Sequence, residues 1–252
     1  MGFFYVDDSK HPAAGFCLSA IVYSNVDLQL DLESTLIKYG LSPGHDEFKS
    51  SIRMDLNPER KLLRTDLMQY LHRCAVGVAI SRISEEMYED SAQLLQWMSG
   101  LPLPLDGPHQ LFADRGIFPK YREQEVLRAI PGTEGYQFHF EQDSRKVCGI
   151  QLADLAAHTC SIMFKDELGL VRKTIKAGEN SGYDPDTDIE LGFEMWAGMR
   201  YCFHLDYASN NDSNDGHPIL PNLGLAISPK LDGRIQAAAR DRFSTMYLGC
   251  IH

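Results

Sequence analysis

Apolar runs and polar stretches alternate along the chain, and their lengths predict a fold that contains both strands and helices. Short apolar runs bounded by turn residues are typical of buried strands, whereas apolar positions three or four residues apart are typical of helices. The runs expected to form strands cover 3–7, 13–23, 74–81, 109–114 and 136–142. The segments expected to form helices cover about 27–39, 57–73, 84–98, 120–130, 188–204 and 229–246, with one more starting near 149. Because strands alternate with helices after an initial hairpin, we predict an α/β fold with a mixed sheet flanked by helices.

The pattern changes beyond about residue 165. The stretches "ENSGYDPDTD" and "NNDSNDGHP" are polar loop signals on either side of an apolar helix candidate, and "GLAIS" precedes the last predicted helix. We therefore predict a core at 1–165 and a C-terminal, mainly helical appendage at 166–252 that packs on it. The sequence leaves open whether this appendage forms a homo-oligomer contact, covers a site or binds a partner.

Three predicted apolar elements each carry an aspartate. Asp7 is expected at the end of the first strand, since Lys10, His11 and Pro12 mark a hairpin turn, and Asp114 ends the strand at 109–114. Asp154 interrupts the helix that starts near Gly149. Small alanines at 153, 156 and 157 would let that helix lie close to the sheet.

Spacing along this helix places Gln151, Asp154 and His158 on one face. Burying a carboxylate costs on the order of several kcal/mol of folding free energy unless a cation or hydrogen-bond donors compensate its charge. Asp154 therefore needs a partner. Each aspartate alone has a structural explanation: an arginine or backbone amides for Asp154, a turn for Asp7, and the adjacent Arg115 for Asp114. Three together favour a divalent metal, because converging carboxylates repel each other and Mg²⁺ prefers oxygen ligands.

Composition narrows the function classes. A formal net charge of −11 argues against a broadly basic nucleic-acid-binding surface, although a small basic groove or metal-mediated phosphate contact remains compatible with it. No apolar run is long enough to span a bilayer, and the first residues lack the features of a signal peptide, so a cytoplasmic protein without membrane contact is expected. The six cysteines have no C-x-x-C or zinc-site spacing and are expected to be reduced core thiols.

Three motifs resemble a known family. "FYVDDS" is similar to its "YIDES" opening, "HDEFK" to its short Glu-x-Lys element, and "DSRKVCGIQLADLAAH" to its "DS…LQLADLIAG" signature. The family is the one catalogued as domain of unknown function 3800, and the resemblance covers roughly 3–165. It implies a ribonuclease H-like fold in which a central strand, a parallel neighbour and a late helix bring acidic residues to one end of the sheet.

The resemblance also assigns residues. The matching positions are Asp7, Glu47, Lys49, Asp143, Ser144, Gln151 and Asp154, with Asp114 as the strand-borne acid between them. This chain departs from the pattern at Asp8, where glutamate is usual, and at Lys10, where glycine is usual. His158 stands where the family commonly has glycine, so it is expected to crowd or join the site.

The implied activity is that of a nuclease with two Mg²⁺ or Mn²⁺ ions. Asp7 would bridge the ions, Asp114 and Asp154 would complete the metal ligands, and Glu47 would be a further ligand or orient a water. Lys49 would neutralise a phosphate oxygen. The residues expected to support these are Asp8, Asp143, Ser144, Gln151 and His158.

Nucleic acid would be the substrate, with DNA and RNA, or a small phosphodiester, left open. An aspartyl-nucleophile phosphatase is disfavoured, because the second acid it needs two residues after the nucleophile is here Ser9. The other alternative is a non-catalytic regulatory or structural protein that keeps the fold and uses its acidic pocket only for binding.

Overall fold

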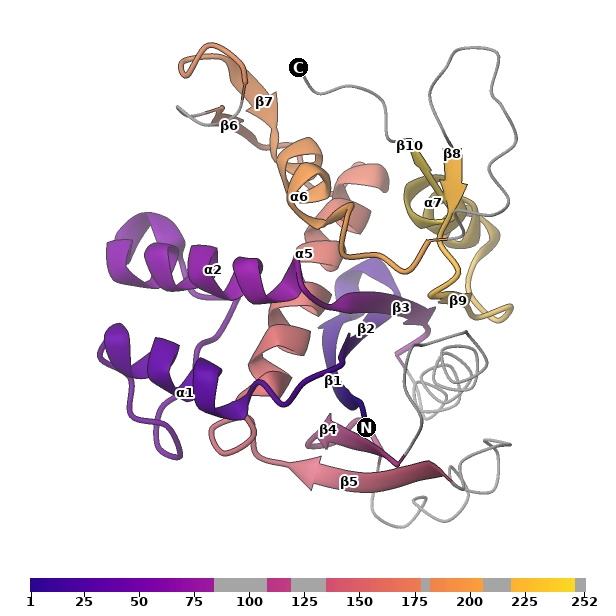
Figure 1. The fold of residues 1–252 in the computed structure, drawn as a ribbon. Coiled ribbons are helices and arrows are strands. Elements are labelled where there is room, and N and C mark those ends of the chain that lie inside the picture. Colours follow the sequence, from indigo (N-terminus) through magenta and orange to yellow (C-terminus); the bar gives the residue numbers. More distant parts are fainter. Residues whose placement is uncertain (84–107, 119–134, 178–181, 206–218, 248–252) are drawn as a thin grey trace.

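The computed structural model describes residues 1–83, 108–118, 135–177, 182–205 and 219–247. Its centre is a six-stranded sheet with the order β5-β4-β1-β2-β3-β9 (Figure 1). The strands are β1 (Phe3–His11), β2 (Phe16–Ser24), β3 (Ala75–Ser81), β4 (His109–Asp114), β5 (Tyr136–Gln142) and β9 (Leu225–Ile227). Among these, β2 is antiparallel to both of its neighbours, and the other pairs are parallel.

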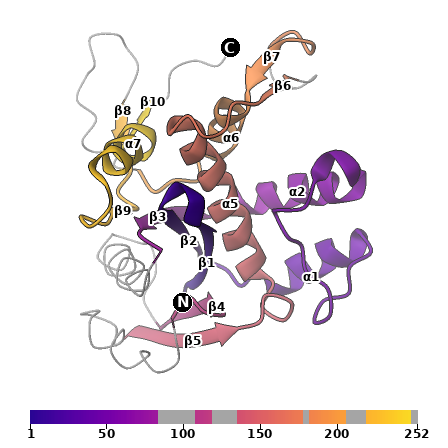
Figure 2. The same ribbon diagram turned by 180° about the vertical axis from the view of Figure 1, so that it is seen from behind.

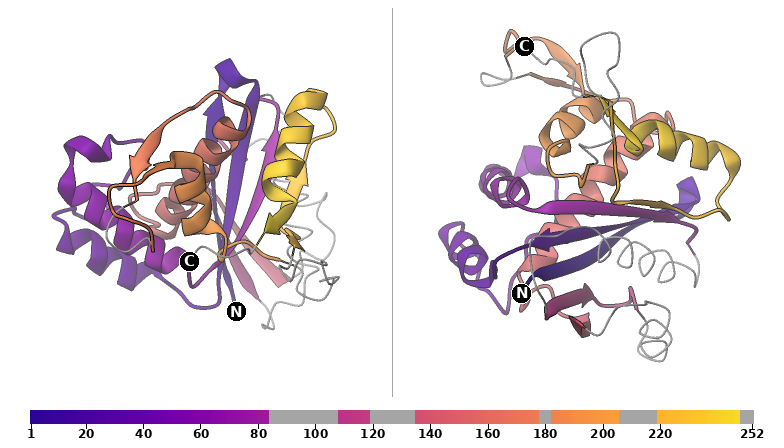
Figure 3. Two further views of the ribbon diagram at one scale, coloured as in Figure 1. Left: turned by 90° about the horizontal axis from the view of Figure 1, so that it is seen from above. Right: turned by 45° about the vertical axis from the view of Figure 1, so that its right-hand side comes forward.

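One face of the sheet packs against helices. They are α1 (Gln29–Lys38), α2 (Pro58–Leu71), α5 (Gly149–Glu167), α6 (Leu191–Met199) and α7 (Gly233–Phe243). The long helix α5 crosses this face, with α1 and α2 toward one side and α7 toward the other (Figures 2 and 3). The predicted class is confirmed: a mixed sheet flanked by helices, with the central strand, parallel neighbour and late helix of a ribonuclease H-like fold. The helices predicted at 84–98 and 120–130 lie outside the described residues.

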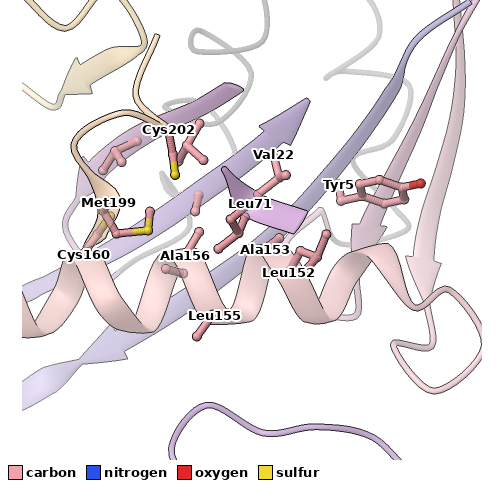
Figure 4. Close-up of a cluster of buried hydrophobic side chains, with 14 of the residues drawn as sticks. Tyr5, Val22, Leu71, Leu152, Ala153, Leu155, Ala156, Cys160, Met199 and Cys202 are labelled. Atoms are coloured by element: carbon pink, nitrogen blue, oxygen red, sulfur yellow. The ribbon is translucent and has the colours of Figure 1, made fainter. Parts of the chain in front are cut away.

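The alternation of side chains along β1 divides the core into two clusters. Phe3 and Tyr5 face α5, whereas Phe4 and Val6 contribute to a smaller cluster on the opposite face. On the α5 side, small helix residues such as Ala153 and Ala156 lie against the strands (Figure 4). The five cysteines that the structure describes are all buried and free, as expected of reduced core thiols.

The first hairpin differs from the prediction. Strand β1 continues past Asp7 to His11, so Asp7 is paired with Ala20 within the strand instead of ending it. The turn is a short 3₁₀ helix at Pro12–Ala14, closed by Gly15 at φ 77°, a conformation that glycine adopts without strain. Backbone pairing with β2 continues through Asp8, Ser9 and Lys10, and this pairing extends the strand beyond its apolar part.

Beyond α5 the chain adds to the core. Strand β9 pairs with β3, and α6 and α7 pack on α5. Two small pairs, β6 (Thr174–Lys176) with β7 (Asp188–Glu190) and β8 (Ile219–Pro221) with β10 (Thr245–Tyr247), complete this part. The predicted division at residue 165 stays a prediction, and the helix expected at 188–204 is shorter because β7 takes its first residues.

Candidate functional site

Two of the predicted acids come from adjacent parallel strands. Tyr5 on β1 is in register with Phe112 on β4, and their rings stack with centroids 5.7 Å apart. Asp7 and Asp114 follow two residues later on each strand, so both side chains lie on the face that α5 covers. They are close enough for the charge of Asp114 to raise the pKa of Asp7.

The third acid comes from α5, and a close contact fixes the position of this helix along β1. Gly149 lies against the Tyr5 ring so closely that a Cβ atom there would be 2.2 Å from Cε1 of the tyrosine. From this contact, five helix residues advance about 7.5 Å and two strand residues about 6.6 Å. Asp154 therefore arrives beside Asp7, and its charge also raises the pKa of that carboxyl.

Asp7 is the most enclosed carboxyl of the three, with an exposed fraction of 6%. Its Oδ1 accepts a hydrogen bond from the backbone N–H of Asp8 at 2.7 Å. Burial, together with the negative charges of Asp114 and Asp154, raises the pKa of Asp7 to about 8. At neutral pH and without a bound cation, most Asp7 side chains hold a proton.

The polar loop at 45–51 supplies the groups that fix Asp154. The backbone N–H of Ser50 donates to Asp154 Oδ2 at 2.8 Å, and its hydroxyl lies 3.4 Å from the backbone carbonyl oxygen of Asp154. Burial nevertheless raises the pKa of Asp154, against the effect of these bonds and of Lys49. Ser50 was not predicted as a site residue; its signal was its position directly after Lys49 in this polar loop.

Glu47 and Lys49 bring a further acid and a cation to the cluster. Lys49 Nζ lies 3.2 Å from Glu47 Oε2, which also accepts a hydrogen bond from the Ser144 hydroxyl. Burial alone would lower the pKa of Lys49, but Glu47, Asp154 and Asp7 outweigh it and the pKa is raised. The Lys49 and Glu47 side chains are 43% and 26% exposed, so solvent reaches the cluster from this side.

Gln151 does not join the acids. Its Oε1 accepts from the backbone N–H of Phe48 at 2.8 Å, and its Nε2 donates to the Ser144 carbonyl at 2.7 Å. The side chain is buried and thus ties the 45–51 loop and the 143–148 turn to α5. Through these two bonds, Gln151 fixes the loop that carries Glu47 and Lys49 next to the turn that carries Ser144.

Asp143 is held by arginines at the edge of this arrangement. Arg145 contacts its two carboxylate oxygens at 2.9 and 2.7 Å, and Arg115 reaches one of them at 3.0 Å. These hydrogen bonds, chiefly from Arg145, hold the pKa of Asp143 well below its usual range. The carboxylate anchors the turn that presents Ser144.

The structure does not bring Asp8 and His158 into the cluster. Asp8 follows Asp7 in a regular strand and lies on the opposite face of the sheet, where Lys10 Nζ is 3.0 Å away. His158 lies one turn beyond Asp154, and burial with the charges of Lys165 and Arg64 lowers its pKa to about 4. His158 is therefore a half-buried, neutral imidazole beside the site.

The carboxylate oxygens of the cluster are ligands of the type that Mg²⁺ and Mn²⁺ prefer. They belong to Asp7, Asp114, Asp154 and Glu47. Their arrangement does not yet match a metal site: the described residues contain no group of three or more His, Cys, Asp or Glu side chains arranged to hold a metal ion. The carboxylates are instead held by bonds from Asp8, Ser50 and Ser144. Their assignment as metal ligands stays a prediction.

Comparison with known proteins gives little further guidance. No family model matches the chain, and no curated protein matches it. A chain of the solved complex of PCNA and RNase HII from Archaeoglobus fulgidus aligns over 85% of this chain and 99% of its own length, with 14% identity and a TM-score of 0.42. These values are too low to support a conclusion about this chain. In the described ranges, no helix has the length and apolar character needed to cross a membrane.

Proposed function

We propose that the protein is a metal-dependent phosphodiester hydrolase, a nuclease, whose centre is formed by Asp7, Asp114 and Asp154. The observation that carries this proposal is the burial of Asp7 beside the other two carboxyls, whose negative charges raise its pKa. Three acids from two strands and a helix meet, and no arginine of the described residues forms an ion pair with them. Such an arrangement disfavours the metal-free fold, and active sites commonly retain it.

The convergence of the motifs supports membership of the family catalogued as domain of unknown function 3800. The three quoted segments are far apart in the sequence, yet Gln151 joins two of them through Phe48 and Ser144. Asp7 of the first segment lies beside Asp154 of the last. A shared catalytic centre is a sufficient reason for such long-range contacts.

Each residue then has a role in hydrolysis. Two Mg²⁺ or Mn²⁺ ions, when bound by Asp7, Asp114 and Asp154, would supply water activation and stabilisation of the leaving oxygen. Glu47, oriented by Ser144, accepts a proton from the attacking water. Lys49 is partly exposed and places its ammonium group against a non-bridging oxygen of the substrate phosphate.

The substrate we propose is nucleic acid. The net charge of −11 makes the surface as a whole repel a phosphate backbone, so binding has to depend on local groups. Lys49 is one, and Arg115 and Arg145, which share the single carboxylate of Asp143, leave a net positive charge close by. The cytoplasmic location and the homo-oligomer remain predictions.

A non-catalytic protein that retains the acidic pocket is the second candidate. Two observations favour it: the described side chains form no ready metal-binding group, and Lys49 already supplies a positive charge to the acids. In this case a cation or partner would bind without turnover. Activity measurements separate the two candidates.

The test is cleavage of labelled single- and double-stranded DNA and RNA with Mn²⁺, Mg²⁺ or EDTA. Wild type should cleave at least one substrate with a metal ion and none with EDTA. Asp7→Asn should keep the fold and lose activity by about 10³-fold or more, because it removes a charge acting on the transition state. Asp66→Asn is the matched control, because Asp66 is a half-buried acid of α2 that pairs with Lys38 instead of the cluster. Equal activity of Asp7→Asn and wild type would reject the assignment.

A further inference from the structure

The end of β5 has an irregular backbone at Glu141. In the ranges that the structure describes, Glu141 is the only residue other than glycine with a positive φ, 54°, a conformation that side chains seldom allow. The pairing with β4 shifts at the same point. Phe112 pairs with His139, but two residues later Asp114 pairs with Gln142, so two steps along β4 correspond to three along β5. Glu141 therefore belongs to a β-bulge, a feature that often re-aims side chains beside active sites.

The bulge decides which residue of β5 lies beside Asp114. Without the extra residue, the register that joins Phe112 to His139 would place Glu141 opposite Asp114, and paired residues point to the same face of a sheet. A further carboxylate would then repel the acids of the cluster. In the bulged strand this place belongs to Gln142, which carries no charge and donates a hydrogen bond to the Phe140 carbonyl at 2.7 Å.

The Glu141 side chain instead holds the turn that follows Asp114. Its Oε1 accepts a hydrogen bond from the backbone N–H of Gly116 at 2.9 Å. Between these residues of the turn, Arg115 donates to Asp143, two residues after Glu141, at 3.0 Å. Two side-chain hydrogen bonds thus fix the chain directly after Asp114 to the end of β5.

The bulge also affects where the chain leaves the sheet. Ser144 follows Glu141 by three residues, and its hydroxyl donates to Glu47 while its carbonyl accepts from Gln151. Because a bulge bends the strand that contains it, a regular strand would send Ser144 in another direction. The positions of Asp114 and Glu47 therefore depend on the same residue of β5.

We propose that Glu141 is a positioning residue of the acidic cluster, acting through its backbone conformation and its bond to Gly116. The inference rests on the proposed function, in which Asp114 is a metal ligand. The Glu141 carboxylate is exposed and bonded to the turn, so it acts on the ligands from outside. Replacing a residue that orients metal ligands typically weakens metal affinity by roughly 10- to 100-fold.

The test is isothermal titration calorimetry of the full chain with Mn²⁺, without substrate, on Glu141→Asn and Glu141→Gln. Asparagine adopts a positive φ more readily than most residues, so Glu141→Asn should keep the bulge. Its side chain is one methylene shorter and should lose the bond to Gly116, weakening Mn²⁺ binding roughly 10- to 100-fold. Glu141→Gln keeps the length and an acceptor oxygen, so it should retain most of the wild-type affinity.

Gln137→Asn is the matched control. It shortens another exposed side chain of β5 by the same methylene and removes a hydrogen bond to β4, which Gln110 Nε2 donates at 3.0 Å. Mn²⁺ affinity should not change. Urea unfolding in EDTA distinguishes positioning from a merely structural role: Glu141→Asn and Gln137→Asn should unfold at similar urea concentrations, although only Glu141→Asn loses affinity.

Three results would overturn the inference: wild-type affinity in Glu141→Asn, an equal loss in Gln137→Asn, or a loss in Glu141→Gln as large as in Glu141→Asn. If Glu141→Asn does not fold, Glu141→Gly decides the question, because glycine adopts this φ without strain and also lacks the acceptor. Wild type that binds no Mn²⁺ would reject the proposed function and this inference with it. Tight binding by both wild type and Glu141→Asn would reject the inference alone.

Discussion

At the residue scale, the buried carboxyl of Asp7 makes stability depend on pH. Its pKa is about 8 in the folded protein and near the ordinary 3.8 when unfolded. Between these values the folded state holds a proton that the unfolded state has lost, so the free energy of unfolding should fall as pH rises from about 4 to about 8. The contribution is at most about 1.4 kcal/mol per pH unit.

Urea unfolding at several pH values between 5 and 8, in EDTA, tests this dependence. The Asp7→Asn variant has no titratable group at this position, so its free energy of unfolding should lose this part of the pH dependence. The stability of the variant relative to wild type should therefore increase as the pH rises. The comparison cancels other groups, such as His158, whose lowered pKa acts in the opposite direction. Parallel stability curves for the two proteins would show that Asp7 is an ordinary, ionised acid.

Some site residues could be predicted from the sequence and others could not. Asp7, Asp114 and Asp154 each disturb an apolar element, which is a local signal that needs no partner. The role of Gln151 in joining the 45–51 loop to the 143–148 turn has no such local signal. Its two hydrogen-bond partners are Phe48, 103 residues away, and Ser144 in a turn. The resemblance implies a supporting role for Asp8, but a strand sends successive side chains to opposite faces, so the Asp8 side chain lies on the other face of the sheet from Asp7.

At the element scale, the contact between Gly149 and Tyr5 sets the distance from α5 to β1. Gly149→Ala should destabilise the protein by about 1–3 kcal/mol, because the added Cβ meets the Tyr5 ring and the helix has to move. This loss exceeds the gain in helix propensity of about 1 kcal/mol. The same displacement would separate Asp154 from Asp7 and weaken any metal binding.

Gly198→Ala in α6 is the matched control for unfolding measurements. Its added Cβ would meet Met68 Cε at an ordinary 3.7 Å, so the substitution should be neutral or stabilising. If both substitutions change the free energy of unfolding alike, the Tyr5 contact does not hold α5 in place.

The same scale explains which elements were predictable. The strands at 75–81, 109–114 and 136–142 and the helix from 149 have strong local patterns, and the structure has them at nearly the predicted bounds. The continuation of β1 through Asp8, Ser9 and Lys10 lacks such a pattern, since polar residues read as a turn when the partner strand is unknown. Pairing with β2 decides the outcome.

At the scale of the whole molecule, long-range pairing assembles the site and completes the sheet. Strand β4 pairs with β1, although about a hundred residues separate them in the sequence. Strand β9, from near the end of the chain, pairs with β3. A three-residue strand such as β9 carries too little pattern to be assigned to a sheet in advance. The approach of Asp7, Asp114 and Asp154 follows from this topology, and it creates the charge repulsion on which the proposed function depends.

The central claim is that this repulsion is relieved by a divalent cation, and thermal melts of wild type and Asp154→Asn in EDTA, Mg²⁺ and Mn²⁺ test it most directly. In EDTA the variant should be as stable as wild type or more so, because it removes a repelling charge while its amide oxygen can still accept the Ser50 hydrogen bond. An ion that binds the folded state should stabilise wild type by about 2.7 kcal/mol at a hundredfold excess over its dissociation constant, and the variant should lose most of that gain. The account is contradicted if neither ion stabilises wild type more than the variant while Asp154→Asn is strongly destabilised in EDTA, since Asp154 would then be a structural residue.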